Sequence, residues 1–357
     1  MGMSSYERGL IGLATLAVII VVAGWIGRDK QRYRRVLAGT VAATLVLVVL
    51  GAFVRLSDAG LGCPDWPGCY GNLSPHHASA QILDAEAAQP GGPVSLAKAW
   101  KEMIHRYLAM TVGALIAAIL VAAWRNRRTW RQSPWLPTVI AATVIFQAAL
   151  GAWTVTMLLR PAIVTSHLLG GIATLSLLTW LWSRQPGMRW SDGIMSRKDV
   201  RTFGWIALAV LFGQIVLGGW VSTNYAALAC QDFPTCQGAW VPEMSFASAF
   251  HIVRPLGVGP DGELLTLDAL RAIHWVHRIG ALLTLVVVGG FAVKLMREKS
   301  AVSSARWLLA LLVLQLLLGV SNVWFSLPLP VAVAHNGVAA LLFASLLLIN
   351  LRLSRSV

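Results

Sequence analysis

The stretch Ile104-His-Arg-Tyr-Leu-Ala-Met-Thr-Val-Gly-Ala-Leu-Ile-Ala-Ala-Ile-Leu-Val-Ala-Ala-Trp124 decides the fold of this chain. It carries no charge after Arg106 and has about the 20 residues that a helix needs to cross a bilayer. Eight other runs share this apolar character: Gly9–Gly27, Val36–Val54, Leu136–Met157, Ala162–Trp182, Thr202–Val221, Ala272–Val293, Arg306–Ser326 and Val331–Leu351. Because 57% of the residues are apolar and only 12% are charged, an ordinary soluble fold is excluded. The sequence predicts an all-α integral membrane protein with nine spans.

The net charge of +14 is distributed unevenly between the two sides of such a protein. If the spans alternate in direction, 20 of the 29 Lys and Arg residues fall on one side, and 11 of the 15 acidic residues on the other. The basic side holds Arg28–Arg35, Arg125–Arg131, Arg184–Arg201, Lys294–Arg306 and the Arg352/Arg355 tail. Basic connections stay in the cytoplasm, so we expect the C-terminus inside and the long loops outside. The charge therefore requires no nucleic-acid partner.

The first apolar run, Gly9–Gly27, allows two interpretations. Its position and apolar character are those of a signal peptide. However, only Arg8 precedes it among the basic residues, and cleavage would leave the cluster Arg28–Arg35 to be translocated. We therefore expect residues 1–35 to form an extra N-terminal transmembrane helix and a basic cytoplasmic linker.

An internal repeat divides the other eight spans into two sets of four. The first copy of its loop reads Leu50-Gly-Ala-Phe-Val54, then Cys63-Pro-Asp-Trp-Pro-Gly-Cys69, and the second reads Leu217-Gly-Gly-Trp-Val221, then Cys230-Gln-Asp-Phe-Pro-Thr-Cys236. Further along each copy, Gln147-x3-Gly151 matches Gln315-x3-Gly319. The duplication predicts two pseudo-symmetric four-helix transmembrane bundles, residues 36–185 and 202–357, joined by a cytoplasmic linker at 186–201. Sites are expected inside each bundle, between facing helices.

Four histidines occupy matching places in the repeat. His105 and His167 belong to the first bundle, and His277 and His335 belong to the second. An ionisable side chain within a span is costly and indicates a functional site, whereas the alternative is a neutral imidazole that donates to a neighbouring helix. The paired arrangement favours function, because two imidazoles facing each other across an apolar bundle can hold a heme iron from both sides. The sequence has no Cys-x-x-Cys-His, so such a heme would be non-covalent.

An arginine follows the first histidine of each pair. Arg106 and Arg278 come directly after His105 and His277. Both are candidates for pairing with heme propionates near the membrane surface, and the alternative is ordinary snorkelling to the interface. Their matching positions favour propionate binding.

One position beside the histidines differs between the halves. Glu102 lies three residues before His105 and shares its helical face, whereas the second half has His274 there. A carboxylate at this place is a candidate acid or base for oxidation of a bound substrate. The alternative is a helix-start Glu favoured by the macrodipole. His274 is an alternative ligand to His277, but His277 has the repeated Arg neighbour.

The four cysteines form two Cys-x5-Cys pairs in the outer loops, each with a Pro inside. On the oxidising side of a membrane, such pairs predict the disulfides Cys63–Cys69 and Cys230–Cys236. A zinc site fits less well, because structural zinc motifs usually place about two to four residues between the ligands.

Together these motifs resemble the heme A synthase family over almost the whole chain after the first span. The resemblance is carried by Arg55-Leu-Ser-Asp-Ala-Gly-Leu-Gly-Cys63-Pro-Asp-Trp-Pro-Gly-Cys69-Tyr-Gly, Glu102-x-x-His105-Arg106, Ser166-His167-Leu-Leu-Gly-Gly, His277-Arg278-Ile-Gly-Ala and Ala334-His335-Asn-Gly. It implies that the first bundle takes heme O as substrate through His105 and His167, with Glu102 as the catalytic acid or base. It implies that the second bundle holds heme b as a cofactor through His277 and His335.

The resemblance also implies a reaction and partners. The C8 methyl group of heme O would be oxidised through an alcohol to the formyl group of heme A, which serves cytochrome aa3-type oxidases. Heme O synthase, oxidase assembly factors and membrane lipid would be partners, and a homo-oligomer is left open. The extra N-terminal helix, and the second Cys pair, which some members lack, depart from the simplest family pattern. Since no Arg- and Ser-rich transit segment precedes the first span, we expect a bacterial inner membrane, with the Cys loops periplasmic.

Two other functions use the same features. A non-enzymatic diheme b-type electron carrier needs the four histidines but not a glutamate in one half only. A transporter with repeated bundles needs no heme at all.

Overall fold

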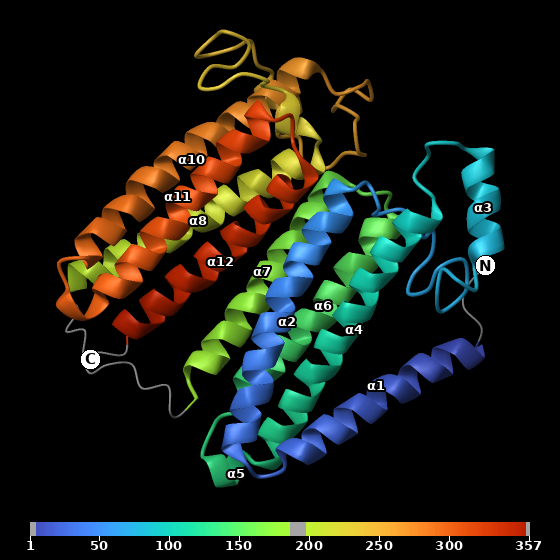
Figure 1. Ribbon diagram of the computed structural model, residues 1–357, viewed down its shortest axis with the longest axis vertical. Coiled ribbons are helices and arrows are strands. Elements are labelled where there is room, and N and C mark those ends of the chain that lie inside the picture. Colours follow the sequence, from blue (N-terminus) through green and yellow to red (C-terminus); the bar gives the residue numbers. More distant parts are fainter. Residues whose placement is uncertain (1–4, 186–197, 355–357) are drawn as a thin grey trace. The chain divides into compact units, whose positions relative to one another are not determined.

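A computed structural model describes residues 5–185 and 198–354, which are helical and contain no extended β-strand. Residues 186–197 of the predicted linker, and Arg355 of the basic tail, lie outside the described residues. The chain divides into two compact units, which we describe separately (Figure 1). The first comprises Met1–Leu159 and Gly170–Gln185, and the second comprises Arg160–Leu169 and Pro186–Val357.

The nine predicted spans are confirmed: within the described residues, nine helices are long and apolar enough to cross a membrane. They are α1 (Ser5–Ile26), α2 (Lys30–Leu56), α4 (Leu96–Arg125), α6 (Trp135–Thr156), α7 (Pro161–Ser183), α8 (Lys198–Thr223), α10 (Leu267–Leu295), α11 (Val302–Trp324) and α12 (Leu329–Leu353). Shorter elements are α3 (Ser79–Ala88), α5 (Arg127–Trp130), α9 (Phe246–Ala249) and the 3-10 turns η1 (Ala226–Leu228) and η2 (Lys299–Ala301). The protein is therefore an all-α, multi-pass membrane protein.

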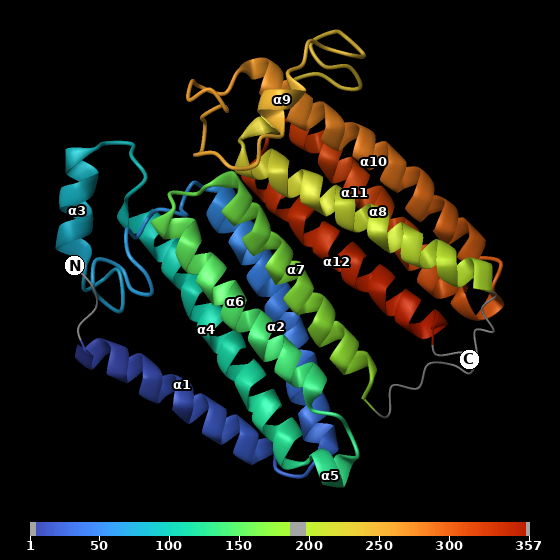
Figure 2. The same cartoon turned by 180° about the vertical axis from the view of Figure 1, so that it is seen from behind.

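In the first unit, α4 packs against α1, α2 and α6. The C-terminal end of α1 is fixed to the bundle: Asn126 Nδ2 donates to the Gly27 carbonyl at 2.8 Å, and Trp130 Nε1 donates to the Arg28 carbonyl at 3.0 Å. Tyr33 packs against Trp130 at this corner, with ring centroids 4.8 Å apart and the ring planes tilted by 53°. From there α1 diverges from α4 toward its N-terminus, as both views show (Figures 1 and 2).

The helix α4 begins eight residues before the apolar run that predicted it. The Ser95 hydroxyl accepts the Lys98 amide at 3.3 Å, so Ser95 caps the helix and Leu96 is its first residue. Glu102 therefore lies in the second turn, and the explanation of this residue as a helix-start Glu is wrong. In the same way Thr266 caps α10, well before His277.

In the second unit, α8 packs against α10 and α12. The fourth helix, α11, also packs against α10 and α12. The four helices run side by side (Figure 2). At one end Asn350 Nδ2 donates to the Gly204 carbonyl at 3.0 Å, a contact that only a glycine allows, since a Cβ at this place would lie 2.1 Å from Asn350 Oδ1. The candidate ligands His277 and His335 lie on α10 and α12, and each of these helices packs against two others of this unit.

Candidate functional site: two locked loops and their histidines

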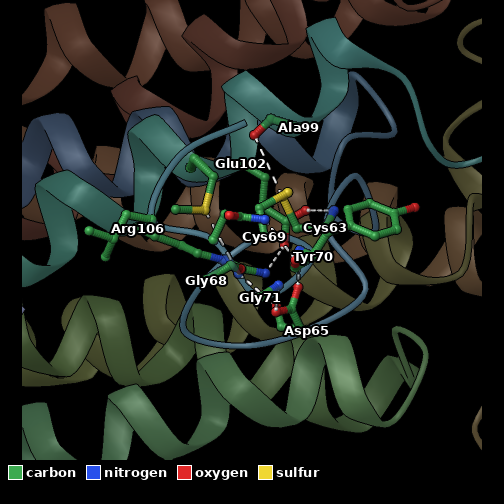
Figure 3. Close-up of a disulfide and its surroundings, with 12 residues drawn as sticks. Cys63, Asp65, Gly68, Cys69, Tyr70, Gly71, Ala99, Glu102 and Arg106 are labelled. Atoms are coloured by element: carbon green, nitrogen blue, oxygen red, sulfur yellow. Dashed lines mark hydrogen bonds and ion pairs between the residues drawn. A yellow bond between two sulfur atoms is a disulfide. The ribbon is translucent and has the colours of Figure 1, made fainter. Parts of the chain in front are cut away.

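A disulfide closes the loop after α2. The Cys63 and Cys69 sulfurs are 2.05 Å apart, as the spacing predicts, and both residues are buried (Figure 3). Inside the loop the Asp65 carboxylate accepts the backbone N–H groups of Tyr70 at 2.6 Å and Gly71 at 2.8 Å. The side chain of Asp65 thus holds the second half of the loop from within.

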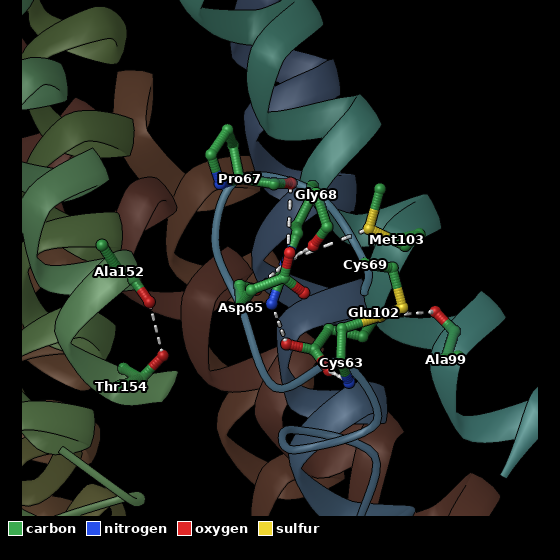
Figure 4. A network of polar contacts seen from close by, with 12 residues as sticks. Cys63, Asp65, Pro67, Gly68, Cys69, Ala99, Glu102, Met103, Ala152 and Thr154 are labelled. Atoms are coloured by element: carbon green, nitrogen blue, oxygen red, sulfur yellow. Dashed lines mark hydrogen bonds and ion pairs between the residues drawn. A yellow bond between two sulfur atoms is a disulfide. The ribbon is translucent and has the colours of Figure 1, made fainter. Parts of the chain in front are cut away.

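Glu102 and Arg106 join this loop to α4. One carboxylate oxygen of Glu102 accepts the Cys63 N–H at 2.9 Å, and the other lies 2.5 Å from Arg106 Nη2. Arg106 Nη1 donates to the carbonyls of Asp65 at 2.8 Å and Gly68 at 2.5 Å. Figure 3 shows Glu102 and Arg106 beside the loop that the disulfide closes, and Figure 4 shows Glu102 next to Cys63. Glu102 is 4% exposed and Arg106 is 8% exposed. We call this buried pair, which holds the Cys loop against α4, the loop lock.

The second half repeats the loop. Cys230 and Cys236 form the second predicted disulfide, and the Asp232 carboxylate accepts the N–H groups of Gln237 at 2.5 Å and Gly238 at 2.9 Å. These bonds, and above all one from the Thr235 hydroxyl, lower the pKa of Asp232 to about 2.

The second lock uses a different acceptor. Arg278 donates to the carbonyls of Thr235 at 2.7 Å and Cys230 at 3.0 Å, as Arg106 does in the first half. In place of Glu102, His274 lies with Nδ1 3.4 Å from the Cys230 amide and Nε2 3.2 Å from Arg278 Nε. A neutral imidazole has one acceptor nitrogen, so one of these two contacts is a full hydrogen bond. His274 therefore belongs to the loop lock, and the interpretation of this residue as an alternative to His277 receives no support.

Three of the four predicted histidines lie against a glycine of a neighbouring helix. A Cβ on Gly51 would lie 3.1 Å from Cε1 of His105, and one on Gly218 would lie 3.1 Å from Cε1 of His277. The third contact joins Gly319 of α11 to His335 of α12, at 3.2 Å.

His277 of α10 and His335 of α12 both belong to the second unit, and both helices pack against α11. His167 is half-buried on α7, in the segment Arg160–Leu169 of the second unit, whereas His105 belongs to the first unit. The pairing of His105 with His167 stays a prediction.

The sequence model of the COX15-CtaA family, described as "Cytochrome oxidase assembly protein", matches residues 34–347. The chain belongs to this family. A heme A synthase of Shewanella oneidensis is 42% identical over 87% of this chain and 93% of its own length. Heme A synthases of Halalkalibacterium halodurans and Allorhizobium ampelinum are 27% and 26% identical, over 89% and 88% of this chain and 96% and 88% of their own lengths.

For a member of this family, the second unit fits a heme. Within the described residues no group of three or more His, Cys, Asp or Glu side chains gathers to hold a bare metal ion, but a heme iron needs only two axial protein ligands. The Nδ1 atom of His335 is buried and has no hydrogen-bond partner, although buried nitrogens are usually paired. A buried imidazole with one nitrogen unpaired, in an apolar bundle, is the environment that a heme ligand requires.

One cavity of the first unit does not coincide with these histidines. It has a volume of about 480 Å³ and lies between α1, α4 and the first Cys loop. Its α4 lining consists of Met103, Tyr107, Met110, Thr111 and Ala114. These positions are on the opposite face of the helix from His105, since successive helical residues are rotated by about 100°. This cavity therefore lies on the other side of α4 from the candidate ligand His105.

Sequence reasoning missed the residues that contact the imidazoles. Gly51, Gly218 and Gly319 were recognised as marks of the repeat, but their contact with the rings was not foreseen. The available signal was the Gln-x3-Gly spacing, which puts an amide and a glycine on one helical face. It occurs on α8 as Gln214-x3-Gly218, as well as in the two copies that the repeat already aligned.

Proposed function

We propose that the chain is a heme A synthase, which oxidises the C8 methyl group of heme O to the formyl group of heme A. The observation that carries this proposal is the 42% identity to a heme A synthase over nearly the full length of both chains. The product would serve cytochrome aa3-type oxidases, in keeping with the family description. An oxidoreductase of this kind also explains why one duplicated half retains a buried carboxylate where the other has His274.

We propose different tasks for the two halves. His277 and His335 would hold heme b, which supplies electron transfer when bound. His105 and His167 would bind heme O as the substrate. Supporting the cofactor site, His277 and His335 both belong to the second unit, and each lies against a glutamine and a glycine of a neighbouring helix.

Glu102 is our candidate for the acid or base of the substrate half. It shares α4 with His105, and its contacts with Arg106 and the Cys63 amide hold the carboxylate in one position. Arg106 and Arg278 also remain candidates for propionate binding. Each uses guanidinium nitrogens on loop carbonyls, so a propionate would bind at the remaining nitrogens or displace a carbonyl.

We propose that the protein lies in the bacterial inner membrane, with the Cys loops in the periplasm and the C-terminus in the cytoplasm. The uneven distribution of Lys and Arg supports this orientation. A green fluorescent protein fused after Val357 should fluoresce, and an alkaline phosphatase fused there should be inactive. The reverse result would overturn the orientation. Heme O synthase and oxidase assembly factors are the partners we expect in this membrane.

The function is tested by expressing the full chain together with a heme O synthase in a host that makes no heme A. Pigments are then extracted from the purified protein and separated by chromatography. We expect heme A, or its alcohol precursor, together with heme b. Heme b alone, with no modified heme O in the cells, would favour the diheme carrier, and a protein without pigment would favour a transporter.

A further inference from the structure

In the second unit each candidate heme ligand lies against a glutamine and a glycine on one neighbouring helix. Gln214 and Gly218 of α8 contact His277, and Gln315 and Gly319 of α11 contact His335. Residues four apart lie on one helical face, so the amide and the glycine of each pair meet the same ring.

The glycine leaves room for the ring, and a second glycine leaves room for the amide. A Cβ on Gly218 would lie 3.1 Å from Cε1 of His277, closer than side chains normally approach. On α10 itself, three residues after His277, a Cβ on Gly280 would lie 2.2 Å from Gln214 Oε1. Any larger residue at either place would displace the imidazole or the amide that contacts it.

The amides are directed at the imidazoles. Gln214 Nε2 donates to the His277 carbonyl at 3.0 Å, which fixes the amide, and lies 3.1 Å from His277 Nδ1. Gln315 Nε2 lies 3.2 Å from Nε2 of His335. The Oε1 atoms of both glutamines are buried without a hydrogen-bond partner. Since leaving a buried acceptor unpaired is costly, a structural role alone does not explain two such glutamines.

Each amide contacts one ring nitrogen and leaves the other one available. For His277 the available atom is Nε2, and for His335 it is the buried, unpartnered Nδ1. When one ring nitrogen binds iron, the other carries the proton, so the amide must accept from it. A half-turn of the amide, which exchanges Nε2 and Oε1, brings the acceptor to the ring nitrogen. Partners of this kind orient metal-ligating histidines in other proteins.

We propose that Gln214 and Gln315 are positioning residues that, with Gly218 and Gly319, hold the imidazoles of His277 and His335 for axial ligation of heme. The inference rests on the proposed heme b site of the second unit.

The test uses the purified full-length protein loaded with heme b. The variants are Gln214→Leu, Gln315→Leu and Gly218→Ala, and the matched control is Gly213→Ala on the same helix, where a Cβ has no neighbour within 4 Å. We expect heme transfer to apomyoglobin to become about 10- to 100-fold faster in the three variants, the usual effect of removing a partner of a metal ligand. The low-spin ferric electron paramagnetic resonance signal should shift, and Gln214→Glu, which retains an acceptor, should restore slow release. Gly213→Ala should match the parent protein.

Unchanged release and an unchanged resonance signal in both leucine variants would overturn the inference while leaving the proposed function intact. By contrast, a His277→Ala variant that kept heme b with the parent spectrum would remove the ligand assignment itself. If one leucine variant does not fold, the other leucine variant and Gly218→Ala provide the test. Gly218→Ala adds only a methyl group, which lies against the imidazole of His277.

Discussion

Replacing Glu102 separates its two possible contributions, holding the first Cys loop and transferring protons. The variant Glu102→Ala removes both carboxylate contacts, whereas Glu102→His introduces the residue that holds the second loop at the equivalent place. We expect Glu102→Ala to release the loop and Glu102→His to keep it closed. Both should abolish heme A formation, because an imidazole replaces the hydrogen-bond acceptor but not the carboxylate.

The size of the effect follows from the burial of the pair. Removing one partner of a buried ion pair costs about 3–5 kcal/mol, because the other charge is left without compensation. Arg106 keeps its contacts with the Asp65 and Gly68 carbonyls after the change, so we expect the lower end, about 3 kcal/mol. At about 1.4 kcal/mol for each factor of ten, the loop should open roughly a hundredfold more often.

Hydrogen exchange followed by mass spectrometry measures this opening directly. Peptides that contain Cys63 should exchange roughly a hundredfold faster in Glu102→Ala, while peptides from the second loop, around Cys230, should not change. Unchanged exchange at Cys63 would refute the lock. Full heme A formation by Glu102→His would refute the acid or base role and leave Glu102 as a residue that only positions the loop.

Three further predictions address other parts of the molecule. Gly51→Ala should reduce heme A formation by crowding the His105 ring, whereas Gly39→Ala on the same helix, with no neighbour within 4 Å, should not; equal activities would exclude the contact from function. His167→Ala should retain heme b and lose heme A, and loss of heme b alone would assign His167 to the other half. Because the pKa of Asp232 is lowered to about 2, its hydrogen bonds should stabilise the second loop above about pH 4 and be lost as the pH falls toward 2. Exchange at Gly238 should rise over that range, and a similar rise with acid in Asp232→Asn would count against this cause.

The spans were predictable because each one is a long apolar run, and a run of this length is itself the signal for a transmembrane helix. The starts of α4 and α10 were not, because their first turns are polar and the apolar run begins later. The caps Ser95 and Thr266 were available as signals, since hydroxyl residues favour the N-cap. Counting only apolar residues placed the helix starts too late, and with them the position of Glu102.

The loop contacts were beyond local reasoning for a different reason. Glu102 meets an amide 39 residues away, and Arg106 meets a carbonyl 41 residues away. Helical periodicity identifies the face that the two side chains share but not the loop that covers it. The repeat placed Arg106 and Arg278 at matching positions as propionate candidates, and in the structure both donate to carbonyls of their Cys loops, a role that the sequence analysis did not predict.

The duplication also makes the differences between the halves informative. Both loops have a disulfide at the same place, an Asp side chain that accepts two backbone N–H groups, and an arginine that donates to loop carbonyls, so the Cys loop itself cannot account for chemistry in one half only. What differs is the group that the arginine contacts. Arg106 meets the carboxylate of Glu102, whereas Arg278 meets the imidazole of His274. The first half therefore has a buried carboxylate, a group that can give and take a proton, where the second half has none, and this difference is what the proposed division of tasks between the halves requires.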